Sequence, residues 1–155
     1  MKLFQWTVCF YLLTAVPAIA QSAAQLEANK KLAQKFFQSF GNPAQLNELI
    51  HPDYVQHNPV VKAWDDEHHA SGRDGLLKFM QSGGFGPPPG ADKGKKQAPP
   101  PAPKIVLTTA EGDIVTVVWK MMEKDKAGAP YEAFNFDTWR VKDGKLYEHW
   151  DGARR

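Results

Sequence analysis

The sequence predicts an α+β fold in which helices come first and a curled antiparallel sheet follows. Between residues 22 and 81, apolar residues recur at three- and four-residue steps, which is the spacing of amphipathic helices. After Pro103 the pattern changes to an alternation of apolar and polar residues, which is typical of strands. The chain has 155 residues, of which 43% are hydrophobic, and this content suffices for one sizeable core.

The N-terminal 20 residues have the features of a secretory signal peptide. Lys2 supplies a positive charge, the run from Leu3 to Val16 is mostly apolar, and Ala18-Ile19-Ala20 has small residues at the cleavage positions. Cleavage after Ala20 would also remove the only cysteine, so the mature chain would have no disulfide. An uncleaved membrane anchor stays open as an alternative, although this run is short for a span of about 20 residues. We therefore expect a periplasmic or secreted protein, without stable membrane insertion, in which residues 21–155 form one domain.

Three helices are predicted in the first half of this domain. The first covers residues 22–40, and Gly41-Asn42-Pro43 ends it, since glycine after a helix and proline at the next start are common boundaries. A short second helix follows over residues 44–50. The third starts at Ser71 or Gly72. Its apolar side comprises Leu76, Leu77, Phe79 and Met80.

Three other segments of this half are predicted to be non-helical. Residues 54–57 are expected to be extended because Asn58-Pro59 follows them. Residues 60–71 are expected to form a polar loop. Residues 82–103 contain seven prolines and five glycines, and we expect an exposed loop insertion there. A lid over a pocket and a proline-rich docking motif stay open as alternatives for this insertion.

Four strands are predicted after Pro103. They cover residues 104–110, 114–122, 131–141 and 145–151. Asp143-Gly144 is a tight-turn dipeptide between the last two strands, so these strands are expected to pair as a hairpin. The result is a curved antiparallel sheet with about three helices packed on it.

Polar groups on the last two predicted strands form a candidate site. Because side chains alternate along a strand, Asp137 and Trp139 share one face of one strand, and Tyr147, His149 and Asp151 share one face of the other. We expect Asp137 to lie beside His149, with Asp151 further along the same surface. A carboxylate next to an imidazole is a general acid/base pair, and burial can raise a carboxyl pKa towards neutral pH. Trp139 and Tyr147 would provide apolar area for a flat organic ligand.

Other interpretations of these charged residues stay open. A solvated strand face with cross-strand ion pairs, such as Arg140 with Glu148, would also explain many of them. His57 and the run from Asp65 to His69 are metal-ligand types, but neighbouring residues rarely point at one ion and no His-x-x-x-His occurs, so no metal is predicted. No Gly-x-Ser-x-Gly and no phosphate-binding glycine loop occurs. The formal charge of +2, without a basic stripe, argues against nucleic acid as a partner.

Taken together, these motifs resemble the SnoaL-like branch of the NTF2-like superfamily. The resemblance covers about residues 25–152, and its most specific parts are Gln56-His-Asn-Pro59 and Asp143-Gly-Lys-x-x-Glu-His-Trp-Asp151. It implies a cone-shaped α+β barrel in which helices close a curved sheet around a deep cavity. It also implies ring closure by aldol condensation without a cofactor, as in the polyketide cyclases of that family.

The resemblance also assigns roles to residues. The acid/base aspartate of the cyclases matches Asp151, which would remove a proton next to a carbonyl and later return it. Asp137 stands where the cyclases have a histidine, and this departure removes one member of their catalytic set. Gln56 matches a polar residue of theirs, and His57 and Asn58 lie beside it. Donors such as His57, Asn58 or His149 would stabilise the developing enolate.

Two functions, and a third use of the fold, follow as expectations. The first is cofactor-free aldol condensation, cyclase or isomerase chemistry; the second is non-catalytic binding of a hydrophobic or aromatic small molecule. The expected catalytic residues are Asp151, His149 and Asp137. The expected substrate contacts are Gln56, His57, Asn58, Trp139 and Tyr147. The third is an interaction domain, because Val118, Phe134 and Phe136 would suit a homodimer surface on the outer sheet face.

Overall fold

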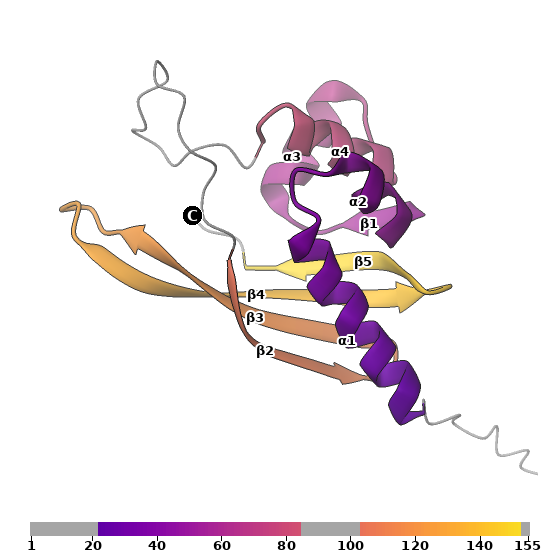
Figure 1. Cartoon of the computed structure of the whole chain (residues 1–155). Coiled ribbons are helices and arrows are strands. Elements are labelled where there is room, and N and C mark those ends of the chain that lie inside the picture. The colour runs from indigo at the N-terminus through magenta and orange to yellow at the C-terminus, as the bar shows by residue number, and fades with distance from the viewer. Residues whose placement is uncertain (1–21, 85–102, 153–155) are drawn as a thin grey trace, which may run out of the picture.

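The computed structural model describes residues 22–84 and 103–152. Within these ranges, four helices pack on a five-stranded sheet (Figure 1). The predicted signal peptide, residues 1–20, and most of the predicted insertion, residues 82–103, lie outside the described residues. Across the two described ranges, no helix is both long and apolar enough to cross a membrane.

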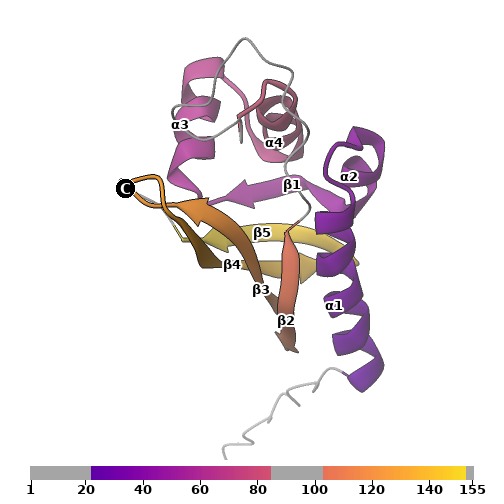
Figure 2. The ribbon, with the colours of Figure 1, turned by 60° about the vertical axis from the view of Figure 1, so that its left-hand side comes forward.

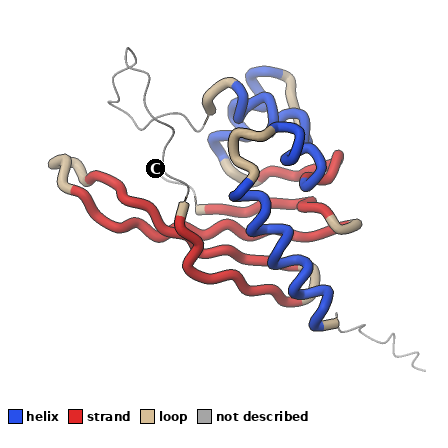
Figure 3. Tube along the Cα trace, viewed as in Figure 1, coloured by secondary structure: helices blue, strands red, loops and turns tan. Residues whose placement is uncertain are grey.

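Two predicted N-terminal helices are present close to their expected bounds. Helix α1 covers Ala23–Gln38, and the side chain of Ser22 caps it by accepting the backbone N–H of Gln25. Helix α2 covers Pro43–Leu49, with proline in its first turn, where the missing N–H costs nothing. Figures 1 and 3 show α1 lying across the sheet, where it contacts β2 and β3.

The prediction of a polar loop over residues 60–71 is wrong, because helix α3 covers Pro59–His68. The reason is local. The side-chain oxygen of Asn58 accepts the backbone N–H groups of Val60 and Val61, and Pro59 occupies the first helical position. Helix α4 then covers Gly72–Gln81, starting where the sequence predicts.

The sheet has the order β1-β5-β4-β3-β2 and is curved without closing (Figure 2). The four predicted strands are β2, β3, β4 and β5, which pair antiparallel in chain order. The predicted extended segment belongs to a fifth strand, β1, which pairs parallel with β5 at the edge of the sheet. The strand bounds are Ile50–Gln56, Lys104–Glu111, Ile114–Lys124, Pro130–Lys142 and Lys145–Asp151.

The core lies between α1 and the sheet and continues beneath α2, α3 and α4. Phe36 and Phe37 of α1 pack against Trp139 of β4, with ring centroids 5.3 and 5.8 Å away. Trp139 is fully buried, so the indole that was expected to form a cavity wall belongs to the packed core. The core also includes Leu46, Leu49, Ile50, Val61, Leu76, Phe79, Val115, Val117 and Leu146.

A register shift interrupts the pairing of β4 with β5. Trp139 pairs with His149, but Val141 pairs with Leu146, so β5 carries an extra residue between these positions. The side chains of β5 therefore do not alternate strictly between the two faces of the sheet at this point. Leu146 is fully buried, and Tyr147 instead packs against His51 and Lys142.

Candidate functional site

Asp137 of β4 and His149 of β5 lie in direct contact. The imidazole Nε2 of His149 is 2.9 Å from Oδ1 of Asp137, and both side chains are largely buried, with 8% and 14% of their surface exposed. The hairpin at Asp143-Gly144 creates this contact because it brings the two strands into antiparallel register. The structure thus brings together the two residues that the sequence places side by side.

Contacts on both sides fix the ring of His149. It stacks on Trp139, with ring centroids 4.9 Å apart, and lies nearly parallel to the ring of Tyr54. Its Nδ1 is 3.0 Å from the side-chain oxygen of Gln56, and the same oxygen accepts the backbone N–H of Asn58. That oxygen is an acceptor in both contacts, so Nδ1 of His149 carries a hydrogen.

A shared proton follows from these contacts. Since Nδ1 donates to Gln56, Nε2 faces a carboxylate oxygen, and a hydrogen bond there requires one proton between Nε2 and Oδ1 of Asp137. The other oxygen of Asp137 accepts the indole N–H of Trp119. The carboxyl group is therefore held from two directions, and the His149–Asp137 pair carries a proton in a place mostly shielded from water.

Asp151 lies at the end of β5, beside this pair. Its Oδ2 accepts the side-chain N–H of Asn58 over 2.6 Å, while Asn58 uses its oxygen to cap α3. The other oxygen, Oδ1, is buried and has no hydrogen-bond partner among the described residues. One nitrogen or oxygen atom from each of Asp137, His149 and Asp151 lies within 4.8 Å of the others. We call these three residues the acid/base cluster.

Tyr54 of β1 is a member of this neighbourhood that the sequence did not single out. It is buried, with 4% of its surface exposed, and its hydroxyl has no hydrogen-bond partner among the described residues. Burial raises its pKa, and the charges of Asp137 and Asp151 raise it further. The indole N–H of Trp139 and the amide of Gln56 act in the opposite direction and lower the pKa of Tyr54. Neither group forms a hydrogen bond of normal geometry with the phenol. The sequence contained a signal for this position: Tyr54 stands two residues before Gln56, so both side chains lie on the same face of a strand.

Two predicted substrate contacts lie outside the cluster. The ring of His57 stacks on Trp150 at 5.5 Å and pairs with Glu148 at 2.9 Å, with 45% of its side chain exposed. The register shift turns Tyr147 towards His51 and Lys142, so it does not share the face of His149. Gln56 and Asn58, by contrast, contact the cluster directly.

The predicted ion pair of Arg140 and Glu148 is confirmed, with Arg140 Nε 3.2 Å from a carboxylate oxygen. Arg140 also pairs with Asp113 at 2.7 Å. The hydrogen bond from His57, together with Arg140, holds the pKa of Glu148 below its usual value, against the opposing effect of burial. This network lies on the side of β5 opposite His149 and is separate from the acid/base cluster.

The acid/base cluster also has the donor types of a metal site. One imidazole nitrogen and two carboxylates suit a divalent ion such as Zn²⁺, and the hydrogen bond from Nδ1 of His149 to Gln56 is a common supporting contact in such sites. These residues differ from the run Asp65 to His69, which was the sequence-level rival and lies on or just after α3. Among the described residues, Asp137, His149 and Asp151 are therefore the group that could hold a metal.

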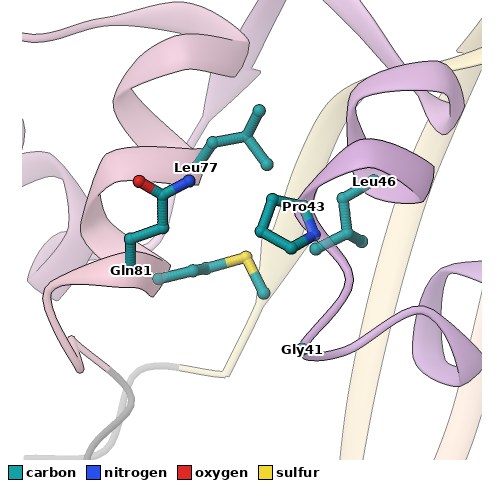
Figure 4. Close-up of a pocket in the computed structure, with 6 residues that line it drawn as sticks. Gly41, Pro43, Leu46, Leu77 and Gln81 are labelled. Atoms are coloured by element: carbon teal, nitrogen blue, oxygen red, sulfur yellow. The ribbon is translucent and has the colours of Figure 1, made fainter.

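A groove lies elsewhere on the described surface. It measures about 260 Å³ and lies between α2 and α4 (Figure 4). None of the acid/base cluster lines this groove, nor a second hollow along β2 and β3. Asp137 and Asp151 are both only partly buried, whereas His149 is buried. The groove is lined by Gly41, Pro43, Leu46, Leu77, Met80 and Gln81.

Comparison with known proteins decides the family. A SnoaL-like domain profile matches residues 33–149, which is most of the chain. The chain belongs to the SnoaL-like family. The matched range of this SnoaL-like protein includes Asp137 and ends at His149, so Asp151 lies two residues beyond it.

Solved structures support this assignment. A loop-truncation variant of IdmH is 26% identical and superposes with a TM-score of 0.57, over 80% of this chain and 91% of that chain. Wild-type IdmH, a putative polyketide cyclase from Streptomyces antibioticus, is 23% identical with a TM-score of 0.54, over 80% and 90% of the two chains. A putative polyketide cyclase from Bacillus cereus is 19% identical with a TM-score of 0.58, over 85% and 78%. A search of curated proteins finds no match.

Proposed function

We propose that this SnoaL-like protein catalyses cofactor-free proton transfer next to a carbonyl group, in an aldol condensation, cyclisation or isomerisation of a small organic molecule. The observation that carries the proposal is the state of Asp151. One of its oxygens is held by Asn58, and the other is buried without a partner among the described residues, beside the proton of the His149–Asp137 pair. A carboxylate held in this way has an oxygen ready to accept a proton.

The proposed reaction has two proton transfers. Oδ1 of Asp151 takes a proton from the carbon next to the carbonyl, and the electrons of that C–H bond move into an enolate. The His149–Asp137 pair is neutral overall, because the charge of the imidazolium is balanced by the carboxylate, so the pair acts on the enolate through its dipole. In an aldol step, the enolate carbon then bonds to a second carbonyl carbon, and the new alkoxide takes the proton back from Asp151. In an isomerisation, that proton returns to a different carbon.

The proposal predicts that Asp151→Asn strongly slows proton exchange. With 1-indanone as a probe in D₂O, the protein should catalyse exchange of the hydrogens next to the carbonyl, as followed by proton NMR. Asp151→Asn should slow this exchange by about 10²–10⁴-fold, since an amide cannot accept the proton. Asp143→Asn is the matched control, because Asp143 lies in an exposed turn and has a positive φ that asparagine tolerates.

The same assay separates proton chemistry from metal chemistry. Exchange that survives treatment with a chelator agrees with the proposal. Exchange that is lost on chelation and restored by Zn²⁺ would mean that the acid/base cluster works through a metal ion. Equal rates for Asp151→Asn and the unchanged protein would overturn the proposed role of Asp151.

Non-catalytic binding is the second candidate, and the groove between α2 and α4 favours it. This groove is lined mainly by apolar side chains (Figure 4). None of the three residues of the acid/base cluster is among them. A protein that only stores or carries a hydrophobic molecule would bind it there. Native mass spectrometry of the purified protein should then reveal a bound molecule, and Asp151→Asn should leave its affinity largely unchanged.

We also propose secretion and pairing with a second copy. The secretion proposal rests on the features of residues 1–20, and N-terminal sequencing of the protein from cells should give a chain that starts at Gln21. The pairing proposal rests on exposed apolar side chains over β2, β3 and β4, which a second copy would cover. They include Val106, Leu107, Met122, Phe134 and Phe136.

A further inference from the structure

Supporting contacts leave His149 and Asp137 with one donor atom each at the centre of the acid/base cluster. Nδ1 of His149 donates to Gln56, and Oδ2 of Asp137 accepts the indole N–H of Trp119. The remaining atoms, Nε2 and Oδ1, lie 2.9 Å apart. An imidazole and a carboxylate that are oriented by hydrogen bonds on their other atoms are typical of metal ligands.

Asp151 supplies a third donor in the same arrangement. Asn58 holds its Oδ2 over 2.6 Å, while its Oδ1 is buried and has no hydrogen-bond partner among the described residues. One donor atom of Asp151 lies within 4.8 Å of those of Asp137 and His149. Because buried polar atoms in folded proteins are nearly always paired, the free oxygen points to a ligand that completes this set.

The spacing of the donor atoms suits a small cation. Two donors that each bind one Zn²⁺ at about 2.1 Å lie about 3 Å apart. The separation of 2.9 Å between Nε2 of His149 and Oδ1 of Asp137 agrees with this value, so an ion can replace the shared proton with little movement of either side chain. Asp151 is the last residue of β5, and a rotation of its side chain would bring an oxygen to the same ion.

Charge balance also favours a divalent cation. Asp137 and Asp151 bring two carboxylates to a place where both are partly buried and His149 is buried. The one shared proton leaves one of their two negative charges unbalanced, whereas one divalent ion balances both. Since an uncompensated charge is costly away from water, the cluster gains free energy from such an ion.

We propose that Asp137, His149 and Asp151 bind one divalent transition-metal ion such as Zn²⁺, and that the bound ion inhibits the proposed proton transfer. Binding forms bonds from Nε2 and from one oxygen of each carboxylate to the ion, and the shared proton passes to water. The imidazole nitrogen selects against Mg²⁺ and Ca²⁺, which prefer sites made of oxygen atoms alone. The inhibition rests on the proposed function, because the ion occupies the base Asp151, but the binding does not.

Isothermal titration calorimetry of the purified protein tests the binding. Zn²⁺ should bind tightly at one ion per chain, and Mg²⁺ should not bind. Asp137→Asn and Asp151→Asn should each weaken Zn²⁺ binding by about tenfold or more, because loss of even a supporting contact commonly costs this much at a metal site. Asparagine keeps the shape of the side chain, and circular dichroism should show that both variants fold.

Asp66→Asn is the matched control. Asp66 is exposed on α3 and belongs to the run Asp65 to His69, whose side chains are the other metal-ligand types close together in the sequence. This substitution makes the same change of carboxylate to amide and should leave the affinity for Zn²⁺ unchanged. An affinity that falls in Asp66→Asn and not in Asp151→Asn would place the ion on α3 and overturn the inference.

NMR of the protein with ¹⁵N-labelled histidine identifies the coordinating atom. Addition of one equivalent of Zn²⁺ should remove the Nε2–H signal of His149, because the ion takes the place of that proton. The Nδ1–H signal should remain, since Gln56 accepts this hydrogen. Unchanged signals of His149 in the presence of bound Zn²⁺ would overturn the inference.

The exchange assay with 1-indanone separates this inference from the proposed function. Zn²⁺ should slow the exchange, and faster exchange with Zn²⁺ would overturn the inhibition. If Zn²⁺ binds His149 and Asp151 and exchange continues unchanged, Asp151 is not the base, and the metal site stands without the proposed function. If no Zn²⁺ binds, or if Asp137→Asn and Asp151→Asn bind it as tightly as the unchanged protein, the metal site is overturned, whereas slow exchange in Asp151→Asn would still support the proposed function.

Discussion

At the scale of single residues, the function of the site depends on which atoms are already occupied. His149 has both ring nitrogens engaged, by Gln56 and Asp137. Asp137 has both oxygens engaged, by His149 and Trp119. Of the three members of the acid/base cluster, Asp151 is therefore the one that keeps an oxygen for a substrate. The hydrogen-bond partners of each atom therefore distinguish the roles of the two aspartates more clearly than residue type does.

Glu148 allows a prediction of pH dependence on the opposite side of β5. The hydrogen bond from His57, together with Arg140, lowers its pKa in the folded protein, so its contribution to stability is fully present above the ordinary pKa of a glutamate. That contribution is lost as the pH falls through the lower folded value. Glu148→Gln should therefore destabilise the protein at neutral pH, by about 1 kcal/mol, and much less in acid.

Urea unfolding at neutral and at acidic pH measures this difference. Glu67→Gln is the control, because Glu67 is an exposed acid on α3. It should change stability little at either pH. An equal loss for Glu148→Gln at both pH values would show that its ionised form does not contribute through these partners.

At the scale of elements, the start of α3 connects the fold to the site. Asn58 caps α3 with its side-chain oxygen and donates to Asp151 with its side-chain nitrogen. The position of the helix therefore sets the orientation of the carboxylate. Since β1 pairs with β5 immediately before this cap, Gln56 reaches His149 through the same connection.

Two substitutions at Asn58 separate these roles. Asn58→Ala removes both contacts and should destabilise the protein by about 1–2 kcal/mol, as the loss of a helix cap commonly does. Asn58→Asp keeps a capping oxygen but replaces the donor to Asp151 with a second carboxylate. Its stability should exceed that of Asn58→Ala, while its exchange rate with 1-indanone should fall.

Chemical denaturation and the NMR exchange assay measure the two effects. If Asn58→Asp exchanges protons as fast as the unchanged protein, Asn58 does not orient Asp151 for catalysis. If Asn58→Ala is as stable as the unchanged protein, the cap contributes nothing to the folded state.

At the scale of the whole molecule, the helices and the outer sheet surface lie on opposite faces. The helices lie on one side of the sheet, as Figures 1 and 2 illustrate, and the core lies between them and the sheet. On the other face, Leu107, Val118 and Phe136 lie in adjacent register across β2, β3 and β4. Leu107 and Phe136 are 55% and 57% exposed, so this row offers apolar area to a second copy of the chain.

A change in this row should alter the oligomeric state. Light scattering coupled to size-exclusion chromatography should give the mass of a dimer for the unchanged protein. Phe136→Glu should give a monomer, since a charge would be buried without a partner in the pair. Val60→Glu is the control, because Val60 is 57% exposed at the start of α3, away from this face. A monomer before any substitution would contradict the pairing proposal.

Local patterns predicted much of the secondary structure. The period of apolar residues predicted α1, α2 and α4 and the four antiparallel strands, because each depends on burying one face of one segment. The error over residues 60–68 came from the polar composition of α3, although the cap-and-proline pair Asn58-Pro59 was a readable start signal.

The sequence by itself determined the family, the order of the elements, and the contact of Asp137 with His149, because a tight turn and alternation are local properties. Only the tertiary structure decided that β1 pairs with β5, since this contact joins segments far apart in the chain. That pairing brings Tyr54, Gln56 and Asn58 to the acid/base cluster. The register shift in β5, which turns Tyr147 away from the cluster, also depends on pairing between strands. It cannot be predicted from the alternation of residues along one strand.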